Sequence, residues 1–112
     1  MRQAKVLFNG EEAGHIVQHD NGHFTFRYTD SWFKNDSKPP ISPTLPKSKQ
    51  ETYAKHLFPF FYNMLPEGVN KSVICRANRI DPDDDFGLLL TTAFHDNIGA
   101  VSLSKIQTNV DS

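Results

Sequence analysis

The first quarter of the chain has the hydrophobic pattern of short β-strands. Residues Lys5–Phe8 and His15–Gln18 read as strands, and the link between them holds two glycines suited to a tight turn or a bulge. After a second turn signal, strict alternation in Phe24–Tyr28 puts three aromatic side chains on one face and two polar ones on the other. We therefore predict an antiparallel meander with one buried face.

The pattern loosens between residues 29 and 52, where four of the seven prolines lie. Ile41, Pro43 and Leu45 share a parity, which indicates a short extended segment. Because Pro43 has no amide donor, that segment would lie at a sheet edge. The polar run Lys47–Thr52 is predicted to be an exposed, mobile loop.

Helical signals dominate the next part. Pro59 suits a first helical position and Pro66 disfavours helical geometry before it, so a helix is expected from about Phe58 to Leu65. The turn Glu67-Gly68 then leads to a second helix, whose apolar stripe consists of Val69, Val73, Ala77 and Ile80.

A third helix is expected to be capped by Asp81 or Asp83, because an acidic start complements the helix dipole. Its apolar side would be formed by Phe86, Leu89 and Leu90. A strand over Ile98–Leu103 would close the domain. The predicted fold is α+β: one domain over residues 1–106, with a small meander sheet, about three short helices and a frayed tail at 107–112.

Composition narrows the classes of function. With 12 basic and 13 acidic residues the net charge is -1, so the chain lacks the electrostatic footprint of direct nucleic-acid binding. Cys75 is the single cysteine, which excludes an internal disulfide and fits a reducing compartment. No apolar run approaches the roughly 18 residues of a membrane span. We predict a cytoplasmic protein.

The catalytic and metal-binding motifs that the sequence suggests are both incomplete. Asp85-Phe86-Gly87 spells the metal-binding triplet of protein kinases, but its glycine-rich loop, strand lysine and catalytic loop cannot be placed. A calcium loop starting at Asp81 would need glycine and glutamate where Phe86 and Thr92 stand. Helix capping and core packing explain these residues. We therefore predict no enzymatic activity, no cofactor and no metal.

The aromatic cluster before Pro66 is too large to face inward from one short helix. Its surplus, with the following turn, predicts a partner-binding patch, since exposed apolar patches mark interaction sites. The candidate residues are Phe60, Phe61, Met64, Leu65, Pro66, Glu67, Gly68 and Val69. Lys71, Arg76 and Arg79 give the next helix a basic flank, either as a solvated face or for an acidic partner.

Five segments together resemble the N-terminal domain of HipA-type serine/threonine kinase toxins. The resemblance runs from about Ala4 to Lys105, and its segments are Val6–Tyr28, Pro40–Ser42, Phe58–Gly68, Asp81–Leu90 and Gly99–Val101. It implies a small antiparallel sheet, partly closed like a barrel, with packed helices. In that family the domain precedes a much longer kinase domain.

No kinase domain follows in this sequence, so the chain resembles HipS, the small antitoxin of HipBST systems. That resemblance implies binding and inhibition of a separately encoded HipT/HipA-like kinase, with a HipB-like DNA-binding protein as a further member of the complex. Family members often carry an aromatic residue directly after the turn glycine. Val69 stands there instead, so if that aromatic plugs the kinase, this protein must inhibit differently or less well.

Two alternatives stay open. The chain could be a fragment of a longer HipA-like kinase, in which this domain braces the kinase lobe or a dimer. It could also be an adaptor that binds only a HipB-like protein. Whether the reading frame continues past Ser112 separates the first alternative from a free-standing antitoxin.

Overall fold

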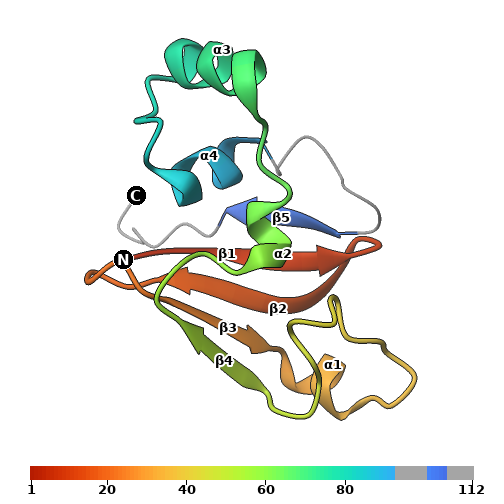
Figure 1. Cartoon of the computed structure of the whole chain (residues 1–112). Coiled ribbons are helices and arrows are strands. Elements are labelled where there is room, and N and C mark those ends of the chain that lie inside the picture. Colours follow the sequence, from red (N-terminus) through yellow and green to blue (C-terminus); the bar gives the residue numbers. More distant parts are fainter. Residues whose placement is uncertain (93–100, 106–112) are drawn as a thin grey trace, which may run out of the picture.

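The computed structural model describes residues 1–92 and 101–105 (Figure 1). These described residues form five strands and four helices. Their order and bounds are β1 (Arg2–Phe8), β2 (Glu11–Gln18), β3 (Phe24–Tyr28), α1 (Asp30–Lys34), β4 (Glu51–Ala54), α2 (Pro59–Tyr62), α3 (Gly68–Asn78), α4 (Asp85–Thr92) and β5 (Val101–Lys105).

The strands form one antiparallel sheet in the order β4-β3-β2-β1-β5. The predicted α+β fold and the meander are thus confirmed, with β3 at its predicted bounds. The sheet is open, with β4 and β5 as its two edges. The partial barrel closure implied by the family resemblance is therefore not formed by the described strands.

Both features predicted for the link between the first two strands are present. Asn9 and Gly10 have φ angles of 52° and 83°, and this left-handed pair makes a tight hairpin turn. Further along, the β1–β2 register shifts, which leaves Ala13 as an extra residue in β2. A Cβ on the neighbouring Gly14 would lie 2.5 Å from the carbonyl oxygen of Arg27, so only glycine fits between β2 and β3.

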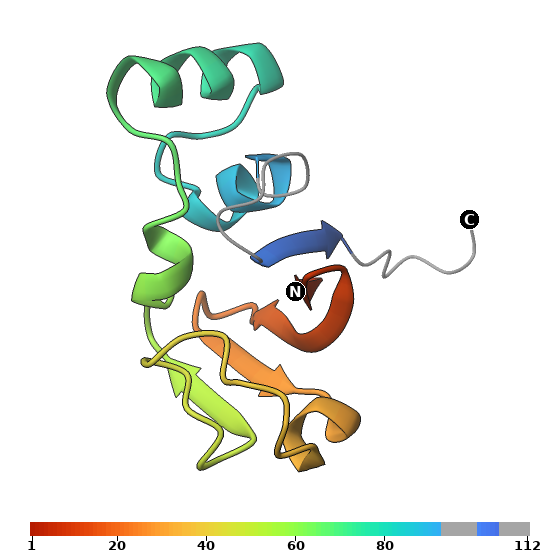
Figure 2. The same cartoon turned by 90° about the vertical axis from the view of Figure 1, so that its right-hand side faces the viewer.

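One hydrophobic core lies on a single face of the sheet. The three aromatic residues of β3 are at most 5% exposed, as their alternation predicted. The Phe26 ring packs 6.1 Å from that of Phe61 in α2, and Phe24 packs 5.6 Å from Phe86 in α4. Figures 1 and 2 show α2 lying over the sheet, with α4 beside β5. The strands therefore fix the position of α2, from which the next turn extends.

The region between β3 and β4 departs from the prediction. It contains α1, a helix that the sequence pattern did not indicate, whose Trp32 packs 5.5 Å from Phe8 and donates its Nε1–H to the Pro39 carbonyl. Residues 41–45 form a turn closed by a bridge from Ser42 to Leu45, so the predicted extended edge segment was wrong. Buried anchors, rather than strand pairing, hold this loop.

The edge strand on this side of the sheet is β4, and not the segment around Pro43. Its residues pair with β3 from Glu51 onward, so the predicted loop Lys47–Thr52 runs two residues too far. Tyr28 organises the approach to this edge, because its hydroxyl accepts the Ile41 N–H and donates to the Leu45 carbonyl. Because this buried hydroxyl both donates and accepts a hydrogen bond, it fixes the proline-rich loop to the core.

Helix boundaries also differ from the expectation. The helix α2 ends at Tyr62, and the chain continues in a tighter turn in which the N–H groups of Met64 and Leu65 bond three residues back. The cap of α4 is Asp84, not Asp81 or Asp83, since its Oδ1 accepts the Gly87 N–H at 3.1 Å. In the last predicted strand, residues 98–100 lie outside the described residues, as does the tail 107–112.

Candidate functional site

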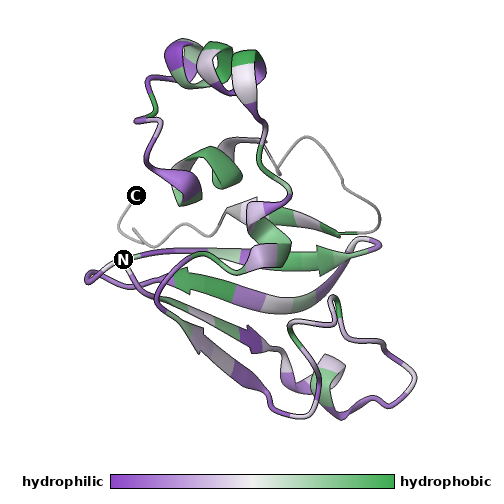
Figure 3. Ribbon diagram, in the orientation of Figure 1, coloured by the Kyte–Doolittle hydropathy of each residue, from purple (hydrophilic) through white to green (hydrophobic). Residues whose placement is uncertain are grey.

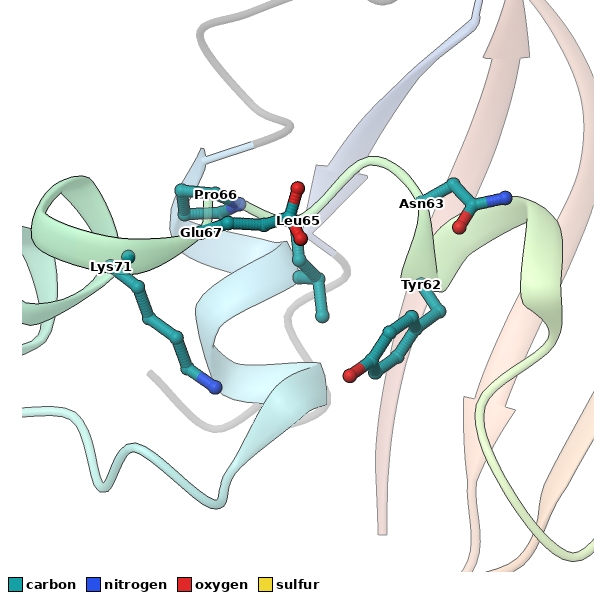
Figure 4. A pocket seen from close by; sticks show the side chains of 7 residues that line it. Tyr62, Asn63, Leu65, Pro66, Glu67 and Lys71 are labelled. Carbon is teal, nitrogen blue, oxygen red and sulfur yellow. The ribbon is translucent and has the colours of Figure 1, made fainter.

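The segment between α2 and α3 forms a hollow at the surface. It encloses about 270 Å³ and is lined by Tyr62, Asn63, Leu65, Pro66, Glu67, Gly68 and Lys71 (Figure 4). The end of α2 and the first turn of α3 supply its walls, and the proline-glycine turn joins them. The hollow therefore includes four of the eight predicted contact residues, Leu65, Pro66, Glu67 and Gly68.

The eight predicted contact residues lie at different depths. Phe61 and Met64 are 0% and 8% exposed and belong to the core. Phe60, Leu65 and Pro66 are half-buried, while Glu67, Gly68 and Val69 are exposed. The structure therefore brings Leu65 through Gly68 together around the hollow, with Phe61 and Met64 supporting them from below.

Glycine is required in the turn for its backbone conformation. Gly68 has a φ of +61°, a left-handed value that side chains with a Cβ rarely adopt. A Cβ there would meet nothing within 4 Å, so the demand is conformational and not steric. Glu67 precedes it in extended geometry as the N-cap of α3, without a side-chain capping bond. This turn sets the direction in which α3 leaves the domain.

The hollow combines an apolar wall with two polar ends. Figure 4 shows the side chains of Tyr62 and Lys71 reaching into it from opposite sides, with Leu65 between them. Tyr62 is 54% exposed, so its hydroxyl is available to a partner. Among the described residues neither Lys71 nor Glu67 forms an ion pair. Such a set can bind a protein segment through apolar contact and hydrogen bonds.

The contact residues predicted from the sequence do not include Tyr62, Asn63 and Lys71, which also line the hollow. A usable signal was present, because Tyr62 and Leu65 are three residues apart, and Glu67 and Lys71 are four apart. Residues at these spacings lie side by side on a helix or tight turn. The close approach of the two helix ends across the turn, however, required the three-dimensional structure.

The kinase-like triplet has a structural role at the start of α4. Phe86 is 1% exposed, and the Arg2 guanidinium lies 5.3 Å from the centre of its ring. Arg2 also binds Asp84 through two bonds of 3.0 and 2.7 Å. Those bonds, with the Gly87 N–H, lower the pKa of Asp84 despite its partial burial. Capping and packing thus account for this segment, as predicted.

The described residues provide neither a grouped set of metal ligands nor a membrane-spanning helix. Within residues 1–92 and 101–105, no three potential His, Cys, Asp or Glu ligands are grouped closely enough to hold a metal ion. None of the helices in this part of the chain is long and apolar enough to cross a membrane. Cys75 is buried in α3, as expected for a packed cysteine.

Comparison with known proteins identifies the domain. The family model for the HipA N-terminal domain matches residues 4–104. A solved structure, the N-terminal domain of HipA toxin, is 27% identical with a TM-score of 0.71, and the match covers 97% of this chain and 96% of that one.

Two relatives differ in how much of their length is matched. The putative kinase Y4mE of Sinorhizobium fredii is 30% identical over 80% of this chain, which spans only 21% of that protein. An uncharacterized protein of Haemophilus influenzae is 30% identical over 94% of this chain and 93% of its own length. The HipA N-terminal domain is a non-catalytic domain. With its sequence and its fold both matched over nearly all described residues, the chain belongs to the HipA N-terminal domain family.

Proposed function

We propose that this protein is a non-catalytic antitoxin that binds and inhibits a separately encoded HipT/HipA-like serine/threonine kinase. The observation that carries the proposal is the match of residues 4–104 to the HipA N-terminal domain family. The Haemophilus influenzae relative supports it, because in that protein the matched region makes up 93% of the length. A HipB-like DNA-binding protein would be a second member of the complex.

Inhibition would act by occlusion, through the α2–α3 turn and its neighbouring loops. The turn is held by the core through Phe61 and Met64, yet it exposes Glu67, Gly68 and Val69. A rigidly supported, protruding turn loses little conformational entropy on binding, which favours affinity. Val69, 78% exposed, would be its foremost side chain.

The test uses the full chain and the kinase encoded beside it. Co-expression should give a complex that survives size-exclusion chromatography, and autophosphorylation of the kinase should fall as the chain is titrated in. A variant carrying Gly68→Ala, which strains the turn, should inhibit less. If no complex forms and autophosphorylation is undiminished, the proposal fails.

A second candidate is favoured by the match to Y4mE, where the domain is about a fifth of a longer putative kinase. In that case the chain is part of a HipA-like kinase and braces its kinase lobe or a dimer. Sequencing the transcript past Ser112 decides between the two. A continuous reading frame into a kinase domain would favour this candidate, and a stop codon would favour the antitoxin.

A further inference from the structure

Three of the four residues of the predicted apolar stripe lie in α3 and are exposed, whereas Ile80 follows the helix and is half-buried. Val69 and Val73 are 78% and 57% exposed, and Ala77 is exposed as well. Of the whole helix only Cys75 is buried. Figures 1 and 2 agree that α3 stands apart from the sheet, beyond α4. An amphipathic helix normally directs such a stripe at a core, so this one lacks its covering element within the described residues.

The charges on α3 are also unlike those of the sheet. Arg2 and Arg27 in the strands both bind carboxylates, of Asp84 and of Asp30 and Glu51. Arg76 and Arg79 on α3 form no ion pair with any described residue, and neither does Lys71. The helix itself contains no acidic residue. Figure 3 shows hydrophilic and hydrophobic bands side by side along it.

Helical spacing puts the two features on one surface. Val73 follows Val69 by four residues, and Arg76 follows Val73 by three, so the three side chains lie along one face. We call Val69, Val73, Arg76 and Ala77 the α3 face. Its apolar residues are small, which allows close approach of a partner backbone, and its guanidinium group can bind a carboxylate through two parallel bonds.

We propose that the α3 face is a second docking element, which binds an apolar helix or strand of the partner kinase flanked by acidic side chains. The inference rests on the proposed function and adds a surface that the turn alone does not supply. A second copy of this chain is a poorer occupant, because pairing two α3 helices brings basic residues only to the contact. An acidic partner segment would complement them.

Docking of α3 would also position the turn. Since α3 begins at Gly68, the helix follows directly on the exposed Glu67 of the turn, while Lys71 lines the hollow from the other side of the helix. A partner held along the helix would keep the turn at the kinase surface. Arg76 would contribute mainly to orientation and association rate, and the valines to the desolvated centre of the contact.

The test measures binding of the full chain to its kinase by calorimetry. Val73→Asp and Arg76→Glu should each weaken binding by at least about tenfold, since both place a carboxylate against an acidic surface. Ser48→Asp, which adds the same charge as Val73→Asp at an exposed loop position, is the matched control for that variant and should bind like the wild type. Circular dichroism and thermal unfolding should show that all three variants are folded.

The outcomes separate this inference from the proposed function. If the wild type binds and both α3 variants bind within about twofold of it, the α3 face is solvated and the inference fails, while the antitoxin proposal stands. If the wild type itself does not bind, the proposed function fails. If the chain alone sediments as a dimer that Val73→Asp dissociates, a second copy covers the face and the inference is overturned.

Discussion

The aromatic side chains of β3 lie at the centre of the molecule, whereas the valines of α3 lie at its surface. Phe26 is fully buried between the sheet and α2, while Val73, just as regularly placed on its own element, is 57% exposed. In both cases the periodicity identifies a face. Whether a face becomes core depends on a second element long enough to cover it, and α3 stands beyond the reach of the sheet.

The largest expected difference between the two regions is in stability. Phe26→Ala should lower the free energy of unfolding by about 3–5 kcal/mol, because it leaves a cavity among packed aromatic rings. Val73→Ala should change it by less than about 0.5 kcal/mol, as expected for an exposed site. Urea denaturation followed by circular dichroism measures both values. A loss above 1 kcal/mol for Val73→Ala would mean that α3 is packed against the domain.

The comparison of β3 with α3 also shows which parts of the fold could be predicted from the sequence. Alternation in β3, the Asn9-Gly10 turn and Pro59 at the start of α2 are local signals, and the structure follows them, although α2 ends at Tyr62, before the end that Pro66 predicted. The helix α1 carried no such signal, because Trp32 is held by contacts with Phe8 and Pro39. Long-range anchors of this kind have no periodicity, so residues 29–50 could not be assigned from pattern alone.

The position of the hollow follows a local signal in the same way. The Pro66-Gly68 turn is a local signal, and it does form the exposed edge of the hollow. Depth was not predictable, since Phe60 and Phe61 are adjacent in sequence but only Phe61 is fully buried. A four-residue helix has one inward position per turn, and the sheet determines which residue takes it.

A smaller effect is expected from the buried hydroxyl that fixes the proline-rich loop. Tyr28→Phe removes the partner of the Ile41 N–H and of the Leu45 carbonyl, which should cost about 1–2 kcal/mol. Burial raises the pKa of Tyr28 above 10.0, although the Ile41 N–H partly opposes the rise. The wild type therefore keeps this stabilisation below about pH 10 and loses it as the pH rises further, because only the unfolded state ionises readily.

Unfolding curves at pH 8 and pH 11 check this prediction. The gap in stability between the wild type and Tyr28→Phe should narrow at the higher pH. If the gap in stability is equal at the two pH values, the phenol is not desolvated and the loop is held by other contacts.

The Arg2–Asp84 pair joins the first strand to α4 and should contribute less. Asp84→Asn keeps an oxygen that can cap Gly87 but loses the charge, so we expect a cost of about 0.5–1 kcal/mol, screened by salt because both side chains are partly exposed. The bonds from Arg2 lower the pKa of Asp84 below 3.8, so this contribution is complete above that value and disappears as the pH falls through the folded-state pKa. Denaturation at pH 7 and pH 2.5 should show a larger difference between the wild type and Asp84→Asn at pH 7 than at pH 2.5.

The smallest expected change is at the end of α3, where one substitution should affect stability and binding in opposite directions. Arg79 ends the helix with a φ of 56°, and the Ile80 N–H bonds to the Cys75 carbonyl across it, a motif in which glycine is the favoured residue. Arg79→Gly should relieve the left-handed strain, partly offset by the greater freedom of glycine in the unfolded chain, for a net gain of about 0.5 kcal/mol. If the basic flank of α3 faces an acidic partner, the same variant should bind the kinase more weakly although it is more stable. Thermal unfolding and calorimetry on one preparation test both, and a variant that gains stability with unchanged affinity would show that Arg79 lies outside the contact.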